Sequence, residues 1–225
     1  MELLLDSVNL ETIRKYIDYY QIIGVTTNPT FLAREGKAFP ASCEAIKKII
    51  GDERQLHIQV SSHVCEEILK EAEAIVSRFG KDTYIKVPVI EEGVKAIKLL
   101  KEDGYRVTAT AVSSVQQAFL AGSVGADYVA PYINRMEALN IDPYEALASI
   151  RNIFDNQKIT TKILGASFKN VAQVLRTYEM GAEAVTVEPP LLTAMSSNLV
   201  TDLWVSNFEK DWEKLHGNRK IYELI

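Results

Sequence analysis

The chain has 225 residues, of which 47% are hydrophobic and 24% charged, a composition typical of a globular protein with a substantial core. Its formal net charge of -5 argues against nucleic acid or an anionic membrane as the main partner, because both are bound through clustered Lys and Arg. Cys43 and Cys65 have neither metal-ligand spacing nor the density of a disulfide framework, so we expect no bound metal and a reduced, cytoplasmic compartment. No apolar run approaches the roughly 18 residues of a membrane-spanning helix, and Met1 leads into Leu3–Leu5 without the basic segment of a signal peptide.

Eight short apolar runs alternate with longer amphipathic segments along the chain. The runs cover Leu3–Asp6, Gly24–Asn28, Leu56–Val60, Tyr84–Val89, Arg106–Val112, Tyr128–Tyr132, Lys162–Ser167 and Ala184–Glu188. A length of about 4–8 residues is typical of strands buried on both faces. Between them, Cys65–Phe79 and Glu92–Asp103 repeat apolar residues at helical spacing. Gly104, Gly125 and Gly181 each precede a run, where the C-terminus of a helix favours a residue tolerant of positive φ.

This alternation predicts either a closed barrel or an open, doubly wound sheet. No glycine-rich phosphate fingerprint follows the first run, which weakens the second option, and the number of runs favours the first. No linker rich in Pro, Gly or Ser divides the chain. We therefore predict an α/β fold, a single-domain (β/α)8 TIM barrel over residues 1–225, with a C-terminal extension helix and tail over about residues 199–225.

Polar side chains stand at or near the downstream end of every run. They are Asp6, Thr26 with Asn28, Gln59, Lys86, Thr110, Tyr132, Ser167 and Glu188. In a (β/α)8 barrel the carboxyl ends of the strands meet at one face, and the active site is assembled there. Any single residue of this set could simply lead into a loop, but the recurrence at eight strand ends indicates a site.

Lys86 has the most unusual position of this set, since it lies inside a strand between the apolar residues Ile85 and Val87. Side-chain alternation directs it toward the barrel interior. Burial and nearby cations would lower its pKa and leave some free amine to attack a carbonyl carbon. The alternative is an ion pair that serves stability alone, for instance with Asp6. Asp6 in turn could shuttle protons for the lysine, or cap the following segment, Ser7–Glu11.

Arg135, Ser167 and Lys169 are candidate phosphate ligands, because loops after the late strands of such barrels often hold phosphate. From spacing alone, a surface role for Arg135 is the stronger interpretation. The three histidines, His57, His63 and His216, share no metal spacing.

Four motifs make the chain resemble the transaldolase family, and within it the small subfamily of fructose-6-phosphate aldolases and short transaldolases. They are Gly24-Val25-Thr26-Thr27-Asn28-Pro29, Ile85-Lys86-Val87-Pro88-Val89, Tyr128-Val129-Ala130-Pro131-Tyr132-Ile133-Asn134-Arg135 and Ala166-Ser167-Phe168-Lys169. The resemblance extends over essentially the whole chain, from Met1 to the segment around Trp212.

The resemblance implies roles for nine residues. Lys86 matches the lysine that forms the Schiff base, and Asp6 matches the acidic residue that assists proton transfer. A water that relays protons is held by the residues matching Gln59, Thr110 and Tyr132. The donor sugar site is lined by Thr26 and Asn28, and phosphate is bound by Arg135 and Ser167. No cofactor is implied, because the lysine itself becomes the electron sink as an iminium.

Two positions separate the activities of the family. Transaldolases of this type usually have a glutamate in place of Gln59 and often a phenylalanine in place of Tyr132, so the resemblance favours the aldolase branch. We expect a class I aldolase that converts fructose 6-phosphate to dihydroxyacetone and glyceraldehyde 3-phosphate, and the reverse. One alternative is a transaldolase that transfers dihydroxyacetone between sugar phosphates of the pentose phosphate pathway. Another is a non-catalytic barrel that binds phosphosugars, which the presence of Lys86 disfavours.

The sequence also departs from the aldolase pattern at three places. Glu188-Pro189-Pro190 replaces a Pro-Leu-Asp-like turn, the loop Met136–Asp142 lacks the expected glycines, and Thr108-Ala109 replaces a Leu-Gly pair. These changes lie near the pocket mouth or the fifth strand, so they bear on the range of substrates.

A C-terminal helix is predicted over Leu199–Leu215, where Trp204, Phe208 and Trp212 recur every four residues on one face. The tail Ile221–Ile225 is also strongly apolar. This face could cap its own barrel. Small members of the family form pentameric rings, often stacked as decamers, with this helix reaching a neighbour, so the resemblance favours a homo-oligomer.

Overall fold

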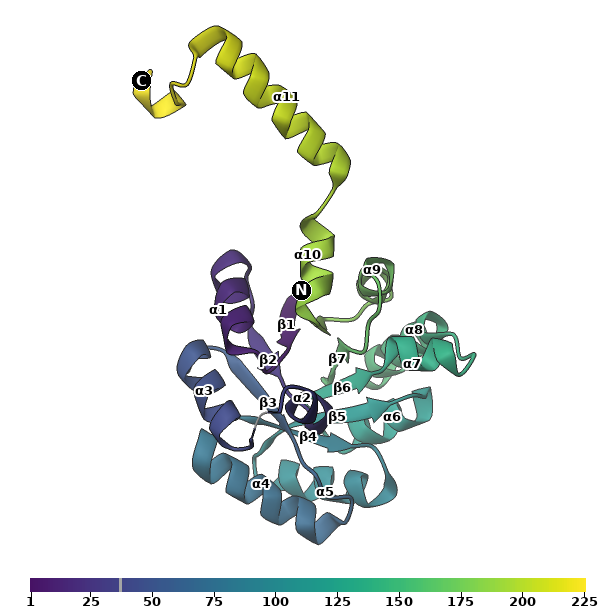
Figure 1. Cartoon of the computed structure of the whole chain (residues 1–225). Coiled ribbons are helices and arrows are strands. Elements are labelled where there is room, and N and C mark those ends of the chain that lie inside the picture. The colour runs from purple at the N-terminus through teal and green to yellow at the C-terminus, as the bar shows by residue number, and fades with distance from the viewer. Residues whose placement is uncertain (37) are drawn as a thin grey trace. The chain divides into compact units, whose positions relative to one another are not determined.

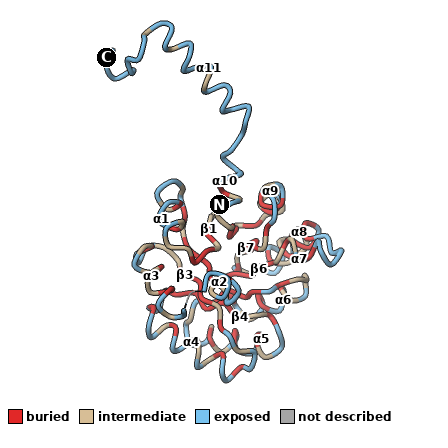
Figure 2. The backbone as a smooth tube through the Cα atoms, in the orientation of Figure 1, coloured by how far each residue is buried: buried red, intermediate tan, exposed pale blue. Residues whose placement is uncertain are grey.

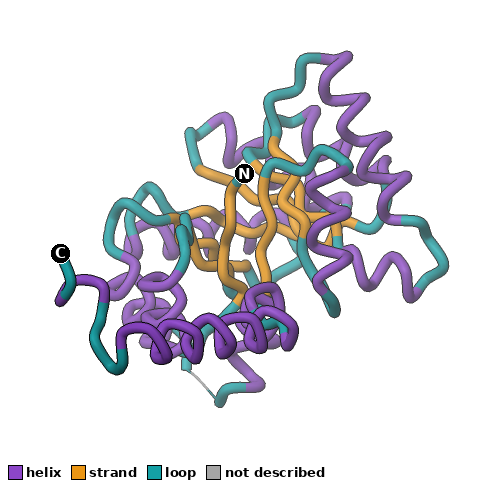
Figure 3. The backbone as a smooth tube through the Cα atoms, turned by 90° about the horizontal axis from the view of Figure 1, so that it is seen from above, coloured by secondary structure: helices purple, strands orange, loops and turns teal. Residues whose placement is uncertain are grey.

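Eight parallel strands close into a barrel in the computed structural model, which describes residues 1–36 and 38–225. The strands are β1 (Glu2–Asp6), β2 (Gly24–Thr26), β3 (Gln55–Gln59), β4 (Tyr84–Pro88), β5 (Arg106–Val112), β6 (Tyr128–Pro131), β7 (Lys162–Gly165) and β8 (Ala184–Val187). Each strand pairs with its neighbours in sequence, and β8 closes the sheet against β1. This arrangement confirms the predicted (β/α)8 barrel (Figures 1 and 3).

Helices follow the strands. They are α1 (Leu10–Tyr19), α2 (Pro29–Arg34), α3 (Ala41–Ile50), α4 (Cys65–Phe79), α5 (Glu91–Glu102), α6 (Val115–Ser123), α7 (Ile133–Ala138), α8 (Pro143–Gln157), α9 (Val171–Glu179) and α10 (Pro189–Ser196). Most of them surround the barrel (Figure 3), whereas α2 lies over its centre (Figure 1). The predicted helix Cys65–Phe79 coincides with α4, and the prediction Glu92–Asp103 lies one residue downstream of α5. Gly104, Gly125 and Gly181 have the positive φ expected after helices, at 78°, 86° and 90°.

The interior of the barrel is filled by apolar and aromatic side chains. One buried cluster joins residues of β1, β4, β6, β7 and β8, strands on different sides of the barrel: Leu4, Tyr84, Tyr128, Ala130, Leu164 and Ala184. On the outer face of β4, Ile85 and Val87 are fully buried beneath the surrounding helices. Figure 2 shows the strands as the most continuously buried part of the barrel. The strands are therefore packed against apolar side chains on both faces, and polar groups are found at the strand ends.

Several strands end earlier than the apolar runs that predicted them. Asn28, Tyr132, Ser167 and Glu188 lie just beyond the strands in which the sequence placed them. Asn28 leaves the sheet because its side chain caps α2, accepting a hydrogen bond from the backbone nitrogen of Phe31 at 3.0 Å. These four side chains are therefore positioned by the segments that follow the strands, at the rim of the barrel, and not by the barrel wall.

Two compact units divide the chain, Met1–Leu191 with the barrel and Leu192–Ile225. The second unit contains α11 (Leu199–His216), which confirms the predicted C-terminal helix, and a short 3-10 helix, Ile221–Glu223. Apolar side chains of α11 are exposed, including Leu199, Phe208 and Leu215. In the described residues, no helix is long and apolar enough to cross a membrane.

Candidate active site

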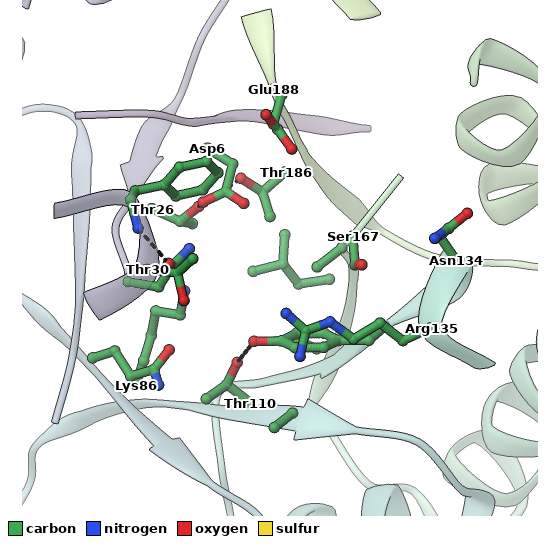
Figure 4. A pocket seen from close by; sticks show the side chains of 18 of the residues that line it. Asp6, Thr26, Thr30, Lys86, Thr110, Asn134, Arg135, Ser167, Thr186 and Glu188 are labelled. Atoms are coloured by element: carbon green, nitrogen blue, oxygen red, sulfur yellow. Dashed lines mark hydrogen bonds between the residues drawn. The ribbon is translucent and has the colours of Figure 1, made fainter. Parts of the chain in front are cut away.

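A cavity of about 400 Å³ opens at the carboxyl ends of the strands. All nine residues predicted for the site line it: Asp6, Thr26, Asn28, Gln59, Lys86, Thr110, Tyr132, Arg135 and Ser167. They come from seven different strands or the segments that follow them, so closure of the barrel is what brings them together (Figure 4). Their chemical roles remain predictions.

Lys86 lies in the wall of this cavity with its side chain almost completely removed from solvent. The residue is 5% exposed, and the strand register places it between Gln59 and Thr108. Its Nζ donates a hydrogen bond of 2.8 Å to the carbonyl oxygen of Thr27. Burial lowers the pKa of Lys86, and the nearby Asp6 carboxylate opposes the shift. The amine is therefore easier to deprotonate than an ordinary lysine, which is what a nucleophile requires.

Asp6 ends β1 on the same cavity, but it does not form an ion pair with Lys86 within the described part of the chain. Its carboxylate accepts a 2.7 Å hydrogen bond from the hydroxyl of Thr26, which also contacts the hydroxyl of Thr186 at 2.7 Å. Burial raises the pKa of Asp6, whereas Lys86 and the Thr26 hydrogen bond lower it. The capping role considered for Asp6 belongs instead to Asn9, whose side chain accepts from the backbone nitrogen of Thr12. Asp6 is thus placed to exchange protons near the lysine.

A group of neutral polar side chains lies beside Lys86. The hydroxyls of Thr110 and Tyr132 are 3.0 Å apart (dashed line at Thr110 in Figure 4). The Oε1 atom of Gln59 is buried and has no hydrogen-bond partner among the described residues. A buried acceptor that faces a cavity without a partner calls for a water or a substrate hydroxyl. This arrangement can hold the relay water that the resemblance implies.

Arg135 and Ser167 lie on the side of the pocket away from Thr26 (Figure 4). The guanidinium of Arg135 stacks 4.9 Å from the centre of the Tyr132 ring and has no carboxylate partner among the described residues. Ser167 adopts a left-handed φ of 61°, and its carbonyl accepts a 2.9 Å hydrogen bond from the backbone nitrogen of Asn134. A cation without a counterion, next to a hydroxyl in a fixed loop, can bind a phosphate.

Lys169, a candidate phosphate ligand, lies in the cavity lining as well. The Oδ1 atom of Asn28 is already occupied by the cap of α2, so its amide nitrogen is the group that can reach a ligand. Among the described residues, no group of three or more His, Cys, Asp or Glu side chains could hold a metal ion.

Arg34 and Thr186 also line the cavity, although neither was among the site residues predicted from the sequence. Thr186 could have been found, because the alternation of β8 places it on the same face as Glu188, two residues later. Arg34 gave no comparable signal, since it follows the end of β2 by eight residues on the short helix α2. Its guanidinium nevertheless reaches across to Glu188, at 3.4 Å.

Comparison with known proteins places the chain in a family of enzymes. The model of the transaldolase/fructose-6-phosphate aldolase family matches residues 3–219. A protein of Streptococcus pneumoniae named "Probable fructose-6-phosphate aldolase" is 42% identical over 98% of this chain and 100% of its own length. Proteins named "Probable transaldolase" from Maridesulfovibrio salexigens and Dictyoglomus turgidum are 39% and 35% identical, each over 96% of this chain and 99% of their own length. The chain belongs to the transaldolase/fructose-6-phosphate aldolase family of enzymes.

Proposed function

We propose that the chain is a class I aldolase that cleaves fructose 6-phosphate to dihydroxyacetone and glyceraldehyde 3-phosphate, and catalyses the reverse reaction, through a Schiff base on Lys86. The observation that carries the proposal is the environment of Lys86. Its amine is buried, has a lowered pKa, donates to a neutral carbonyl and lies in the wall of the cavity. A lysine in this environment can attack the C2 carbonyl of a ketose in its neutral form.

The first stage joins the ketose to the enzyme. The Lys86 nitrogen forms a bond to C2, and the carbonyl oxygen takes up a proton to give a carbinolamine. Loss of that oxygen as water, which also needs a proton, leaves an iminium between C2 and the lysine nitrogen. Asp6 supports both transfers, because its raised pKa lets it hold a proton near neutral pH more readily than an ordinary aspartate.

The second stage breaks the bond between C3 and C4. A base removes the proton from the C4 hydroxyl, the C3–C4 electron pair moves into the iminium, and glyceraldehyde 3-phosphate departs with its phosphate on Arg135 and Ser167. The enamine that remains is protonated at C3, and hydrolysis of the iminium then releases dihydroxyacetone. A water held by Gln59, Thr110 and Tyr132 is the proton carrier in these steps. The Gln59 Oε1, which lacks a partner within the described chain, and the Tyr132 hydroxyl can both bind it.

A transaldolase is the second candidate, because several relatives carry that name. In that reaction the enamine is not protonated but attacks a second aldehyde. The neutral side chains Gln59 and Tyr132 support the aldolase, since an amide and a phenol change which proton the relay can donate. Incubation with fructose 6-phosphate and erythrose 4-phosphate separates the two, because formation of sedoheptulose 7-phosphate faster than free dihydroxyacetone would favour the transaldolase.

Borohydride reduction tests the Schiff base directly. The enzyme is treated with fructose 6-phosphate or dihydroxyacetone and sodium borohydride, digested and analysed by mass spectrometry. We expect a mass increase on the peptide that contains Lys86, and no increase in a Lys86→Met variant. Turnover without a trapped adduct, or an adduct on another lysine, would exclude the proposed mechanism.

We also propose that the enzyme acts in the cytoplasm as a homo-oligomer, a pentamer or a decamer, whose assembly depends on α11. The support for assembly is the exposure of apolar residues along that helix, among them Trp204 and Phe208, which are 57% and 70% exposed. The support for the cytoplasm is that both cysteines are free thiols. Truncation before Asn198 is expected to give smaller or aggregated species by light scattering. A full-length monomer at micromolar concentration would contradict this proposal.

A further inference from the structure

Glu188 occupies a distinctive place at the mouth of the cavity. Strand β8 pairs with β1 through Leu4 with Thr186 and Leu5 with Val187, so the residues that follow, Asp6 and Glu188, leave neighbouring strands side by side. Both line the cavity (Figure 4). The mouth of the pocket next to Asp6 therefore carries two carboxylates.

Two cations pair with the Glu188 carboxylate, one from helix α2 and one from the loop after β7. Its Oε2 atom is 3.4 Å from Arg34 on α2, and its Oε1 atom is 3.9 Å from Lys169 in the loop after β7. Arg34 is further fixed by stacking 4.6 Å from the centre of the Phe31 ring. Because each carboxylate oxygen faces one cation, Glu188 neutralises groups that would otherwise be available to an anionic ligand. Arg135, in contrast, has no such partner in the described residues.

The position of a bound sugar follows from the proposed function, on which this inference rests. If C2 is bonded to Lys86 and the phosphate on C6 is held by Arg135 and Ser167, then C1 must extend away from that phosphate. The part of the cavity lining that remains for C1 includes Asp6 and Thr26, with Arg34 and Glu188 at the mouth. A group attached to C1 would consequently meet Glu188.

We propose that Glu188 determines donor specificity by excluding a phosphate from C1, both through its own negative charge and by occupying Arg34. The pocket then accepts ketoses whose three-carbon donor fragment is unphosphorylated, and it rejects ketose 1-phosphates and bisphosphates. Specificity of this kind arises when a site places a like charge against the wrong ligand. The same carboxylate also contributes to raising the pKa of Asp6, after the larger effect of burial, which agrees with its proximity to the donor end.

A gain-of-function substitution tests this assignment. Glu188→Gln keeps the shape of the side chain, removes the repulsive charge and releases Arg34. The measured quantity is the ratio of kcat/KM for fructose 1,6-bisphosphate to that for fructose 6-phosphate. We expect this ratio to rise by at least about tenfold in Glu188→Gln, and to fall back toward the wild-type value in the double variant Arg34→Gln/Glu188→Gln.

Glu44→Gln is the matched control, because Glu44 also pairs with an arginine, Arg78, but does not line the cavity. A ratio in Glu188→Gln no different from that in Glu44→Gln would overturn the proposal. A gain that persists undiminished in the double variant would overturn the part assigned to Arg34. Calorimetric binding of dihydroxyacetone phosphate provides a readout without turnover: tighter binding to Glu188→Gln than to wild type supports the inference even if fructose 6-phosphate is not the substrate, and unchanged binding contradicts it.

Discussion

The two ends of the barrel differ in whether their polar side chains have hydrogen-bond partners, and two glutamines on β3 illustrate the difference. Gln59, at the carboxyl end of the strand, has a buried Oε1 without a partner among the described residues. Gln55, at the amino end, uses both polar atoms: its Oε1 faces the Nε2 of His57 at 2.9 Å, and its Nε2 donates to the Tyr128 hydroxyl at 3.2 Å. Of two glutamines on one strand, one thus has an oxygen without a partner in the described chain, and the other has a partner for each of its polar atoms.

The network at the amino end continues on both sides of Gln55. The Nδ1 atom of His57 contacts the Thr108 hydroxyl at 2.9 Å, and the Tyr128 hydroxyl donates to the Glu2 carboxylate at 2.6 Å. Burial, reinforced by the charge of Lys86, lowers the pKa of His57 and keeps it neutral. Burial likewise raises the pKa of Tyr128 far above its ordinary value. Such a satisfied network contributes to stability and a single packed arrangement, whereas the unpaired groups at the other end are available to a ligand.

Substitution of Lys86 by methionine is the strongest test of this contrast. Met has a similar length and no charge, so we expect kcat to fall by at least about ten-thousandfold, as when a nucleophile is removed. Stability should stay equal or rise, because a buried cation without a paired carboxylate is replaced by an apolar group. Urea denaturation and an aldol-cleavage assay measure both quantities. Substantial activity, or a large loss of stability, would place Lys86 with the structural residues.

Substitution of Arg135 by alanine should have a smaller and more selective effect. Loss of a charge-assisted hydrogen bond costs about 1.5–3 kcal/mol, roughly 10- to 150-fold in kcat/KM. We expect this loss for glyceraldehyde 3-phosphate as aldehyde substrate and little loss for glyceraldehyde. Arg135→Lys, which keeps the charge but not the planar fork, should give an intermediate value. Equal losses for the two aldehydes would mean that Arg135 does not bind the phosphate.

At the opposite end, Tyr128→Phe should reduce stability and not catalysis. The substitution removes the hydroxyl that pairs with Glu2 and Gln55. Both partners are half-buried and keep a second contact, with Lys162 and His57, so we expect the loss to be that of an ordinary hydrogen bond, about 0.5–1.5 kcal/mol of the free energy of unfolding. Denaturant unfolding measures the loss, and kcat for aldol cleavage serves as the control. If kcat fell as strongly as stability, the two ends could not be regarded as separate in function.

The pH dependence of stability should show the effect of a single titrating group. The pKa of Lys86 is lowered on folding from its ordinary value of 10.5, so the unfolded chain binds more protons between the two values, and stability rises with pH through that window. One group changes the free energy of unfolding by at most about 1.4 kcal/mol per pH unit. The difference in unfolding free energy between wild type and Lys86→Met, measured from pH 7 to 10, isolates this contribution. A difference that is independent of pH would contradict the lowered pKa.

The pattern of the sequence was sufficient to predict the barrel and most of its elements. Eight apolar runs separated by amphipathic helices specify eight parallel strands, since each strand is buried on both faces and each helix buries one. The polar residues at the strand ends were predictable for the same reason: all parallel strands point the same way, so their carboxyl ends converge. Lys86 could be singled out because a charged residue between Ile85 and Val87 is costly unless it is used.

The sequence could not determine the contacts that closure of the barrel creates. Asp6 and Glu188 lie 182 positions apart, and they become neighbours because β8 pairs with β1. Arg34 reaches Glu188 from a helix that carries no repeating signal. The lowered pKa of Lys86 and the unpaired oxygen of Gln59 depend on which atoms surround them in three dimensions. Local periodicity thus decides which residues enter the barrel, and only the closed sheet decides which charges meet and which polar atoms are left for a substrate.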